Sequence, residues 1–338
     1  YRASFKPELP DFFIRRYLMD QGITKATVLD PFGGRGTTVL QANLLGYSGI
    51  HNDLSPVSRF LAASRQFIPE LPELLRRLEA MDLNRRSLRP GKAEKEKLLP
   101  FFHPDTLNEI MNLREELRSP LGAVDDALRY IGLTALSRLH GHSDGFLSVY
   151  SFPQISIMPE AQARNNLRRG QKPEYRPLKE RIARKLRTDL SRELPAGFHR
   201  AAATNRYTGH DARELSSLRS GSVDLVVTSP PFLDKVNYVL DNWMRSWFLG
   251  EPLTEDLTMT PDVGEWCDFM TAVMAELGRV LIPGGRAVIV VGEVAQGGRN
   301  LNLEELLMER LPLKIGRRRL RAEEVLINSQ RFTKLANC

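Results

Sequence analysis

Short apolar runs lead into turns at two places in the chain, in a pattern typical of buried strands that precede helices. Residues 26–29 are apolar or β-branched and end at Asp30, after which a glycine-rich turn opens a predicted helix over 38–45. Residues 223–227 form a second run, which leads into Ser-Pro-Pro-Phe at 229–232. Because proline cannot continue the hydrogen-bond ladder of a strand, we expect both motifs to lie in loops at strand ends.

The middle of the chain, residues 61–200, lacks this alternation and is predicted to be mainly helical. Leucines at 71, 74, 75 and 78 share one helix face, Pro104 suits the first turn of another helix, and residues 124–139 predict a third, largely buried helix. The sequence therefore predicts an α/β domain made of residues 1–60 and 201–338, with the helical segment inserted between its second and third strands. Long insertions cost little closure entropy.

The composition is that of an ordinary soluble globule, with 42% hydrophobic and 26% charged residues among 338. The net charge of +7 and isoelectric point of about 9.5 suit a polyanionic partner. Only Cys267 and Cys338 are present, so we expect no disulfide framework and a reducing, cytoplasmic location. No apolar run approaches the roughly 20 residues that span a bilayer, and no signal peptide is evident. Because residue 1 is tyrosine, we expect at least a start methionine upstream.

Positive charge is concentrated between residues 164 and 187, where ten arginines and lysines face two glutamates, an excess of eight positive charges. A charge run can simply be the solvated face of a helix. The one-signed excess beside Gly170, Pro173 and Pro177 instead favours a loop and helix that hold nucleic-acid phosphates. The predicted phosphate contacts are Arg164, Arg168, Arg169, Lys172, Arg176 and Lys179.

The glycine-rich turn after the first strand is a candidate ligand site because glycines let a backbone approach a ligand closely. The helix that follows favours negative charge at its N-terminus. Gly36 is followed by Thr37 rather than lysine, so the turn is not a Walker loop. Val39 stands where a dinucleotide fingerprint starting at Gly34 needs glycine or alanine. Two common nucleotide-binding motifs are therefore excluded.

A loop with His140, His142 and Asp144 is the nearest approach to a metal site. Two histidines and one carboxylate seldom suffice, and no second histidine or cysteine cluster supports them. We predict no metal here, and interpret the glycine-punctuated loop as one that lies near a nucleic-acid ligand.

The chain resembles the amino-group DNA methyltransferases that use S-adenosylmethionine, over residues 1–60 and 201–295. Its Asp-Pro-Phe-Gly-Gly-Arg-Gly-Thr at 30–37 is similar to the cofactor loop of that family, and its Ser-Pro-Pro-Phe at 229–232 to the catalytic tetrapeptide. The resemblance implies a Rossmann-like class I methyltransferase sheet, with S-adenosyl-L-methionine as cofactor and S-adenosyl-L-homocysteine as product. It also implies duplex DNA as partner in a prokaryotic cytosol, in some members beside a cognate restriction endonuclease.

Further matches fall where this family binds its cofactor. By resemblance, Asp53 accepts from the ribose hydroxyls, Asp211 from the adenine amine, and Asp30 from the backbone or an amine at the methionine end. Residues 3–7 are similar to the loop that closes over the methionine end. The cofactor-binding residues so implied are Phe5, Lys6, Asp30, Pro31, Phe32, Gly33, Gly34, Gly36, Thr37, Thr38, Asp53, Leu54, Ser55, Asp211 and Ala212.

The segment 279–285 followed by 287–292 is similar to the helix, turn and strand that come after the catalytic motif in these enzymes. Inserted blocks in the family often carry target recognition. We therefore expect residues 61–200 to contact DNA, with a purely structural helical cap as the alternative.

The catalytic residues implied are Ser229, Pro230, Pro231 and Phe232. The exocyclic nitrogen of a nucleobase is a poor nucleophile because its lone pair is delocalised into the ring. Hydrogen bonds accepted by the Ser229 side chain and the Pro230 carbonyl would free that lone pair, while Phe232 stacks on the flipped-out base. Serine ahead of the two prolines favours N4 of cytosine as the target, with N6 of adenine as the alternative.

Other functions compete with this one. Carbon-5 methylation requires a nucleophilic cysteine, usually after a proline, but Cys267 follows Trp266 in a predicted helix and Cys338 is terminal. A regulator that binds cofactor and DNA without turnover would not need an intact Ser-Pro-Pro-Phe. A methyltransferase acting on RNA or on protein can share a Pro-Pro-aromatic motif, but Ser229 and the basic segment favour DNA.

Overall fold

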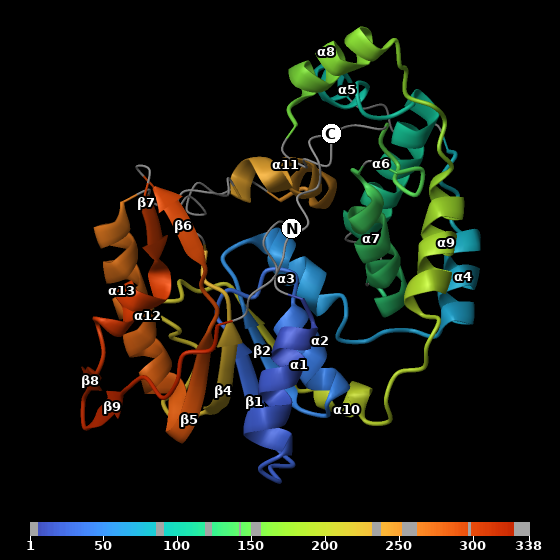
Figure 1. Ribbon diagram of the computed structural model, residues 1–338. Helices are drawn as coiled ribbons and strands as arrows, with labels where there is room; N and C mark the ends of the chain where they lie inside the picture. The colour runs from blue at the N-terminus through green and yellow to red at the C-terminus, as the bar shows by residue number, and fades with distance from the viewer. Residues whose placement is uncertain are drawn as a thin grey trace.

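The computed structural model describes residues 6–85, 91–118, 124–141, 143–149, 157–231, 238–251, 262–296 and 299–327 (Figure 1). The central sheet consists of β1 (Thr27–Asp30), β2 (Ser48–Asn52), β3 (Arg206–Thr208), β4 (Val223–Thr228) and β5 (Leu281–Ile289). Two hairpins lie outside it: β6 (Glu293–Gln296) with β7 (Arg299–Asn302), and β8 (Leu313–Ile315) with β9 (Arg318–Leu320).

The helices fall into two groups. Those connecting or flanking the sheet strands are α1 (Glu8–Ile14), which continues as a π-helix (Arg15–Met19), α2 (Thr37–Leu44), α3 (Pro56–Ala63), α12 (Val263–Val280) and α13 (Leu303–Met308). The others are α4 (Leu71–Glu79), α5 (Lys92–Leu98), α6 (Pro104–Arg118), α7 (Asp126–Arg138), α8 (Pro159–Arg169), α9 (Leu178–Asp189), α10 (Phe198–Ala202) and α11 (Tyr238–Leu249). None of the helices in the described ranges is long and apolar enough to cross a membrane.

The sheet is parallel throughout, in the order β3-β2-β1-β4-β5 (Figure 1). Its side chains alternate between two faces, as the pleat requires. Val28 belongs to a buried cluster with Ile14 of α1 and Ala42 of α2, whereas Leu29 belongs to one with Val273 of α12. Because both faces are covered, most positions of β1, β2 and β4 are buried. The predicted α/β class with a central parallel sheet is confirmed, and the arrangement is compatible with a Rossmann-like fold.

The element boundaries differ slightly from those predicted. The third helix of the middle segment begins at Asp126 rather than 124, because the Asp125 side chain caps it by accepting from the Leu128 amide at 2.6 Å. The strand predicted over 287–292 begins earlier and ends at Ile289. It starts directly after α12 and includes the turn at Gly284, which has φ +80°. The pairing of this strand with β4 changes register there, between Val223 and Leu225 of β4.

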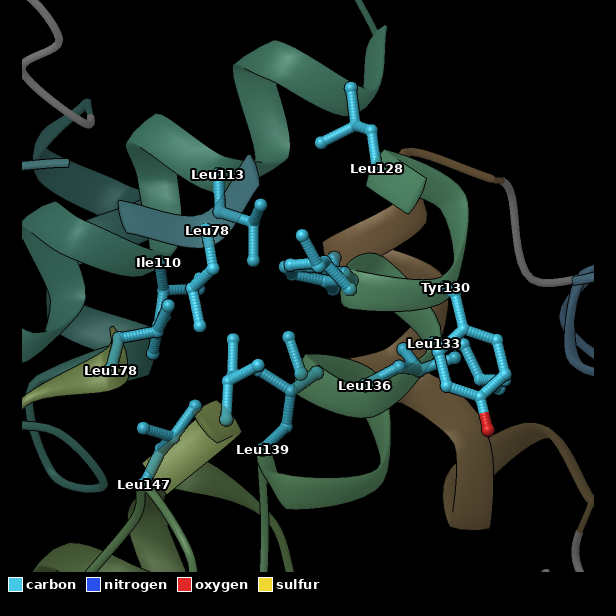
Figure 2. Packing of buried hydrophobic residues seen from close by; sticks show 14 of the residues in the cluster. Leu78, Ile110, Leu113, Leu128, Tyr130, Leu133, Leu136, Leu139, Leu147 and Leu178 are labelled. Atoms are coloured by element: carbon cyan, nitrogen blue, oxygen red, sulfur yellow. The ribbon is translucent and has the colours of Figure 1, made fainter. Parts of the chain in front are cut away.

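Between β2 and β3 the chain forms helices with a core of their own. Figure 2 shows Leu78 of α4, Ile110 and Leu113 of α6 and Leu136 of α7 packed in one buried cluster. The leucine spacing predicted the inner face of α4, because Leu74 and Leu78 are buried while Leu71 and Leu75 pack partly buried against the cluster.

Helix α11 packs into this same core although it follows β4 in the sequence. Met244 and Phe248 are buried in the cluster, and Trp243 packs against it. The indole Nε1 of Trp247 donates to Glu94 Oε1 of α5 at 2.5 Å, and the Arg114 guanidinium of α6 lies 5.0 Å from the Trp247 ring centroid. Helix α11, which follows residue 201 in the sequence, thus packs with helices that precede it.

Candidate active site

The two motifs meet at the carboxyl edge of the sheet. Strands β1 and β4 are parallel neighbours, with Val28 opposite Leu225 and Leu29 opposite Val226. They end at Asp30 and Thr228, so the glycine-rich turn and the Ser-Pro-Pro segment leave the sheet side by side.

Asp30 links the two motifs directly. Its carboxylate Oδ1 accepts from the Thr228 hydroxyl at 2.6 Å and from the Phe32 amide at 3.2 Å, and Oδ2 accepts from the Thr38 hydroxyl at 2.9 Å. The residue is 2% exposed, and burial raises its pKa to about 6. The bond from the Phe32 amide is of the backbone kind that the sequence predicted for Asp30, and its contact with the methionine end of a cofactor stays a prediction.

The glycine turn is held close to the end of β2. The Gly33 amide donates to the Asn52 carbonyl at 2.9 Å, and the Gly34 amide donates to Asp53 Oδ2 at 2.9 Å. A Cβ on Gly33 would lie 2.0 Å from Nδ1 of the buried His51 ring, so this position requires glycine. Gly36, with φ +77°, precedes α2, and Thr37 and Thr38 begin that helix.

Asp53, predicted to face the ribose, follows β2 and is only partly buried. Its Oδ1 accepts from the Ser55 amide at 2.8 Å, while the Ser55 hydroxyl caps α3 by accepting from the Ser58 amide. Burial raises the pKa of Asp53. Each oxygen of the carboxylate can accept a second hydrogen bond, so the side chain can still receive one from a ligand. The neighbouring Leu54 is 36% exposed.

Asp211, predicted to receive the adenine amine, lies beyond the end of β3. The Arg213 side chain donates to it, with Nη2 at 2.6 Å from Oδ2, and this bond lowers the pKa of Asp211. The carboxylate is therefore an anionic acceptor at neutral pH. The Arg213 guanidinium also lies 5.5 Å from the Phe269 ring centroid, and Ala212 is buried.

Asn52 is a connecting residue that sequence reasoning missed. Its amide Nδ2 donates to the carbonyls of Pro31 and His210, and its Oδ1 accepts from the His210 amide and the Thr208 hydroxyl. It thereby joins the loops that follow β1 and β3. The only sequence indication was its place directly before Asp53 at a strand end.

His51, the residue before Asn52, is fully buried and neutral. Burial lowers its pKa to about 3, and its Nε2 lies 3.0 Å from the Ser58 hydroxyl. The ring packs beneath the glycine turn as a structural group and does not act as an acid or base at neutral pH.

The Ser-Pro-Pro segment is anchored on both sides. The Thr228 carbonyl accepts from the Val290 amide at 2.8 Å, and the Pro231 carbonyl accepts from Nε1 of the buried Trp266 at 3.2 Å. Ser229 is partly buried between these anchors and Pro230 is buried. Trp266 was not predicted to contribute. Of the remaining predicted residues, Phe232 and Phe5 lie outside the described ranges, while Lys6 is exposed.

The cations of the basic segment differ in how far they are exposed. Arg164, Arg168, Arg169 and Lys172 are exposed on α8 and the loop after it. Arg176 is 9% exposed and donates to the carbonyls of Phe146 and Ser148, so little of its side chain is accessible to a phosphate. Lys179 donates to the Glu79 carbonyl at 2.7 Å, at the end of α4. Both cations brace the helical region.

The loop that contains His140 also serves a structural purpose. His140 Nδ1 lies 3.0 Å from the Ser148 hydroxyl, and Asp144 forms ion pairs with Arg181 and Arg184 of α9. His142 lies outside the described ranges. Within those ranges, the structure contains no group of three or more His, Cys, Asp or Glu side chains that could hold a metal ion.

Comparison with known proteins gives one local similarity. The chain is 37% identical over 70 residues to the type II methyltransferase M.BsoBI of Geobacillus stearothermophilus. The matched stretch covers 21% of this chain but only 13% of that protein. No family model and no solved structure matches the chain. Over part of its length, the chain is thus similar to a type II methyltransferase.

Proposed function

We propose that this protein is a DNA methyltransferase, which transfers a methyl group from S-adenosylmethionine to the exocyclic N4 of a flipped-out cytosine in duplex DNA. The observation that carries the proposal is the order of groups along the carboxyl edge of the sheet. Asp211, Asp53, the glycine turn and Ser229 follow β3, β2, β1 and β4, which are neighbours in that order.

This order fits the parts of the cofactor in sequence. Asp211 and Asp53 supply acceptors for an adenine amine and for ribose hydroxyls. The glycine turn follows β1 beside them, and its glycines let the backbone come close to the methionine end. Ser229 stands next to that end. A cofactor held along this edge would therefore present its methyl group beside the Ser-Pro-Pro segment. The partial similarity to a type II methyltransferase supports the same assignment.

The chemistry requires mainly positioning by the protein. When bound, S-adenosylmethionine supplies an activated methyl group on its sulfonium. The Ser229 hydroxyl and the Pro230 carbonyl accept hydrogen bonds from the target amine, which localises the nitrogen lone pair toward the methyl group. Phe232 stacks on the extruded base. Holding the two reactants in this geometry supplies most of the rate, and no covalent enzyme intermediate is needed.

The helical region is proposed to contact the DNA. In Figure 1, α1 begins on the upper side and β1 runs back up after it, so the strand ends that carry the motifs face the side on which α8 lies. The exposed arginines of α8 and Lys172 fit a polyanion on that side. Contacts of this kind set affinity and register rather than sequence preference.

The proposal is tested by incubating the protein with labelled S-adenosylmethionine and duplex DNA, RNA or protein in parallel. Digestion of the DNA product to nucleosides, followed by mass analysis, should identify N4-methylcytosine. Finding N6-methyladenine instead would show that adenine is the target base and would leave the proposed mechanism unchanged. Label in RNA or protein alone would reject DNA as the substrate, and cofactor binding with no transfer to any of them would indicate a regulator.

Replacing Asp53 by alanine is expected to weaken S-adenosylmethionine binding by about 1–3 kcal/mol, because a charge-assisted hydrogen bond to the ribose is lost. Titration calorimetry measures the change. Asp125→Ala is the matched control, because that acid also caps a local backbone segment but lies on α7. Unchanged binding in the Asp53 variant would remove this residue from the cofactor site.

Replacing Arg164, Arg168 and Lys172 together by alanine is expected to weaken binding to all duplex sequences. It should also lower the slope of log affinity against log salt by about 2–3, since each phosphate contact contributes about 0.9. The control replaces Lys25, Arg219 and Lys314, which are exposed cations of the same total charge away from α8. Equal slopes in the two triple variants would mean that α8 is only a solvated basic face.

A further inference from the structure

The carboxyl group of Asp30 contacts three separate parts of the site at once. Phe32 belongs to the glycine turn, Thr38 to α2, and Thr228 to the last position of β4. Asp30, Thr38 and Thr228 are each no more than 2% exposed. The cofactor turn and the Ser-Pro-Pro segment are therefore joined through one buried group rather than through solvent.

We propose that Asp30 and Thr228 are positioning residues, which fix the backbone at Ser229 and tie it to the glycine turn. This inference rests on the proposed methyl transfer, because it assigns how the two acceptors for the target amine are held in place.

Thr228, the residue directly before Ser229, is held at two points. Thr228 is held by its side chain, through Asp30, and by its carbonyl, through the Val290 amide. On the other side, the Pro231 carbonyl is held by Trp266. Only Ser229 and Pro230 lie between these anchors, and the proline ring fixes φ. The backbone that carries the Ser229 side chain and the Pro230 carbonyl is consequently held on both sides.

Asp30 and the Val227 carbonyl both contact the hydroxyl of Thr38. The Thr38 hydroxyl has a single hydrogen but two acceptors, Asp30 Oδ2 at 2.9 Å and the Val227 carbonyl at 3.0 Å. If Asp30 carries a proton on Oδ2, it donates to Thr38, and Thr38 donates to Val227, so every group is satisfied. Burial raises the pKa of Asp30 to about 6, so at neutral pH most molecules carry the ionised carboxylate, which accepts from the Thr38 hydroxyl. In either protonation state, the contact between Asp30 and Thr38 joins the start of α2 to the ends of β1 and β4.

Two substitutions at Thr228 separate positioning from folding. Thr228→Val keeps the shape but loses the hydroxyl, and Thr228→Ser keeps the hydroxyl. We expect kcat of the valine variant to fall about tenfold, with the affinities for S-adenosylmethionine and DNA unchanged, and serine to restore the rate. Thr134→Val is the control, because this buried threonine also donates to a backbone carbonyl, that of Tyr130, but lies in α7. It should affect stability without affecting kcat.

Hydrogen exchange of the Ser229 backbone amide tests the positioning role even if no methyl transfer is found. Ser229 carries the only backbone amide between Thr228 and Pro231, so its hydrogen exchange reports the local order of the segment. Exchange should be faster in Thr228→Val than in the parent and Thr228→Ser. If the parent protein transfers no methyl group but the valine variant still exchanges faster, the proposed function is rejected and the positioning role of Thr228 stands. Unchanged exchange and kcat in the valine variant would overturn the inference.

Asp30→Asn distinguishes positioning from direct cofactor contact. The asparagine can still accept from Thr228 and donate to Thr38, so S-adenosylmethionine affinity should change less than about tenfold, the equivalent of one hydrogen bond. A larger loss, with Ser229 exchange unchanged, would show that the negative charge of Asp30 contacts the cofactor and would overturn the assignment of Asp30.

Discussion

Replacing Ser229 by alanine is expected to slow methyl transfer about 10- to 100-fold while leaving S-adenosylmethionine binding intact. In the proposed mechanism, the hydroxyl accepts from the target amine only after the base has left the duplex, so its loss would remove a hydrogen bond made at the reacting centre. The residue is only partly buried at the end of β4, and the segment around it is held by neighbours other than its own side chain. Single-turnover rates, with calorimetry for the cofactor, measure the two effects separately.

Phe232→Ala provides a second test of the same mechanism, because stacking on an extruded base contributes about 1–3 kcal/mol. This variant should also bind the cofactor normally and transfer slowly. Ser217→Ala is the control, because Ser217 is a serine outside the site, in the segment before β4. Parental transfer rates in both Ser229→Ala and Phe232→Ala would contradict the mechanism, whatever base is methylated.

Replacing Gly36 by alanine is expected to destabilise the fold by about 2–4 kcal/mol, from backbone strain and overpacking together. The residue has φ +77°, and a Cβ would lie 2.8 Å from Cβ and 3.1 Å from Cα of Ala62 in α3. A main-chain atom cannot move aside as a flexible side chain can. Urea denaturation measures the loss, and cofactor affinity should fall with it because the turn is displaced.

Gly46→Ala is the matched control for this substitution. Gly46 has a similar φ of +86°, but nothing lies within 4 Å of the Cβ position. Its replacement should lose only the strain of a positive φ, about 1–2 kcal/mol. Equal destabilisation by the two variants would mean that α3 yields to the added methyl group, and that the turn at Gly36 is not closely packed.

The sequence was sufficient to predict the strands before the two motifs and the helices α4, α6 and α7, because these depend on local patterns. Buried runs covered on both faces, leucines on one helix face and proline after a strand each act over a few residues. Trp266, Asn52 and Thr228 could not be predicted as parts of the site. Their roles depend on hydrogen bonds to residues 21–198 positions away in the chain, such as Asn52 to Pro31 and Thr228 to Asp30.

In the basic segment, the sequence predicts the charge but not which side chains are exposed. The net charge of residues 164–187 includes every cation of the segment, but the fold buries some of them. Arg176 and Arg181 are each less than 10% exposed and bond to the loop around Phe146 and Asp144. Charge composition predicts that a segment is basic, whereas burial decides which guanidinium groups a polyanion can reach.

The packing of α11 has a consequence for engineering. The chain leaves the sheet after β2, returns at β3, and then sends α11 back into the helical core, where Met244 and Phe248 are buried. A chimera that exchanged only the block between β2 and β3 for a foreign one would leave the apolar face of α11 against foreign helices. Residues 238–249 would therefore have to be exchanged together with that block, so the unit that packs together is discontinuous in the sequence.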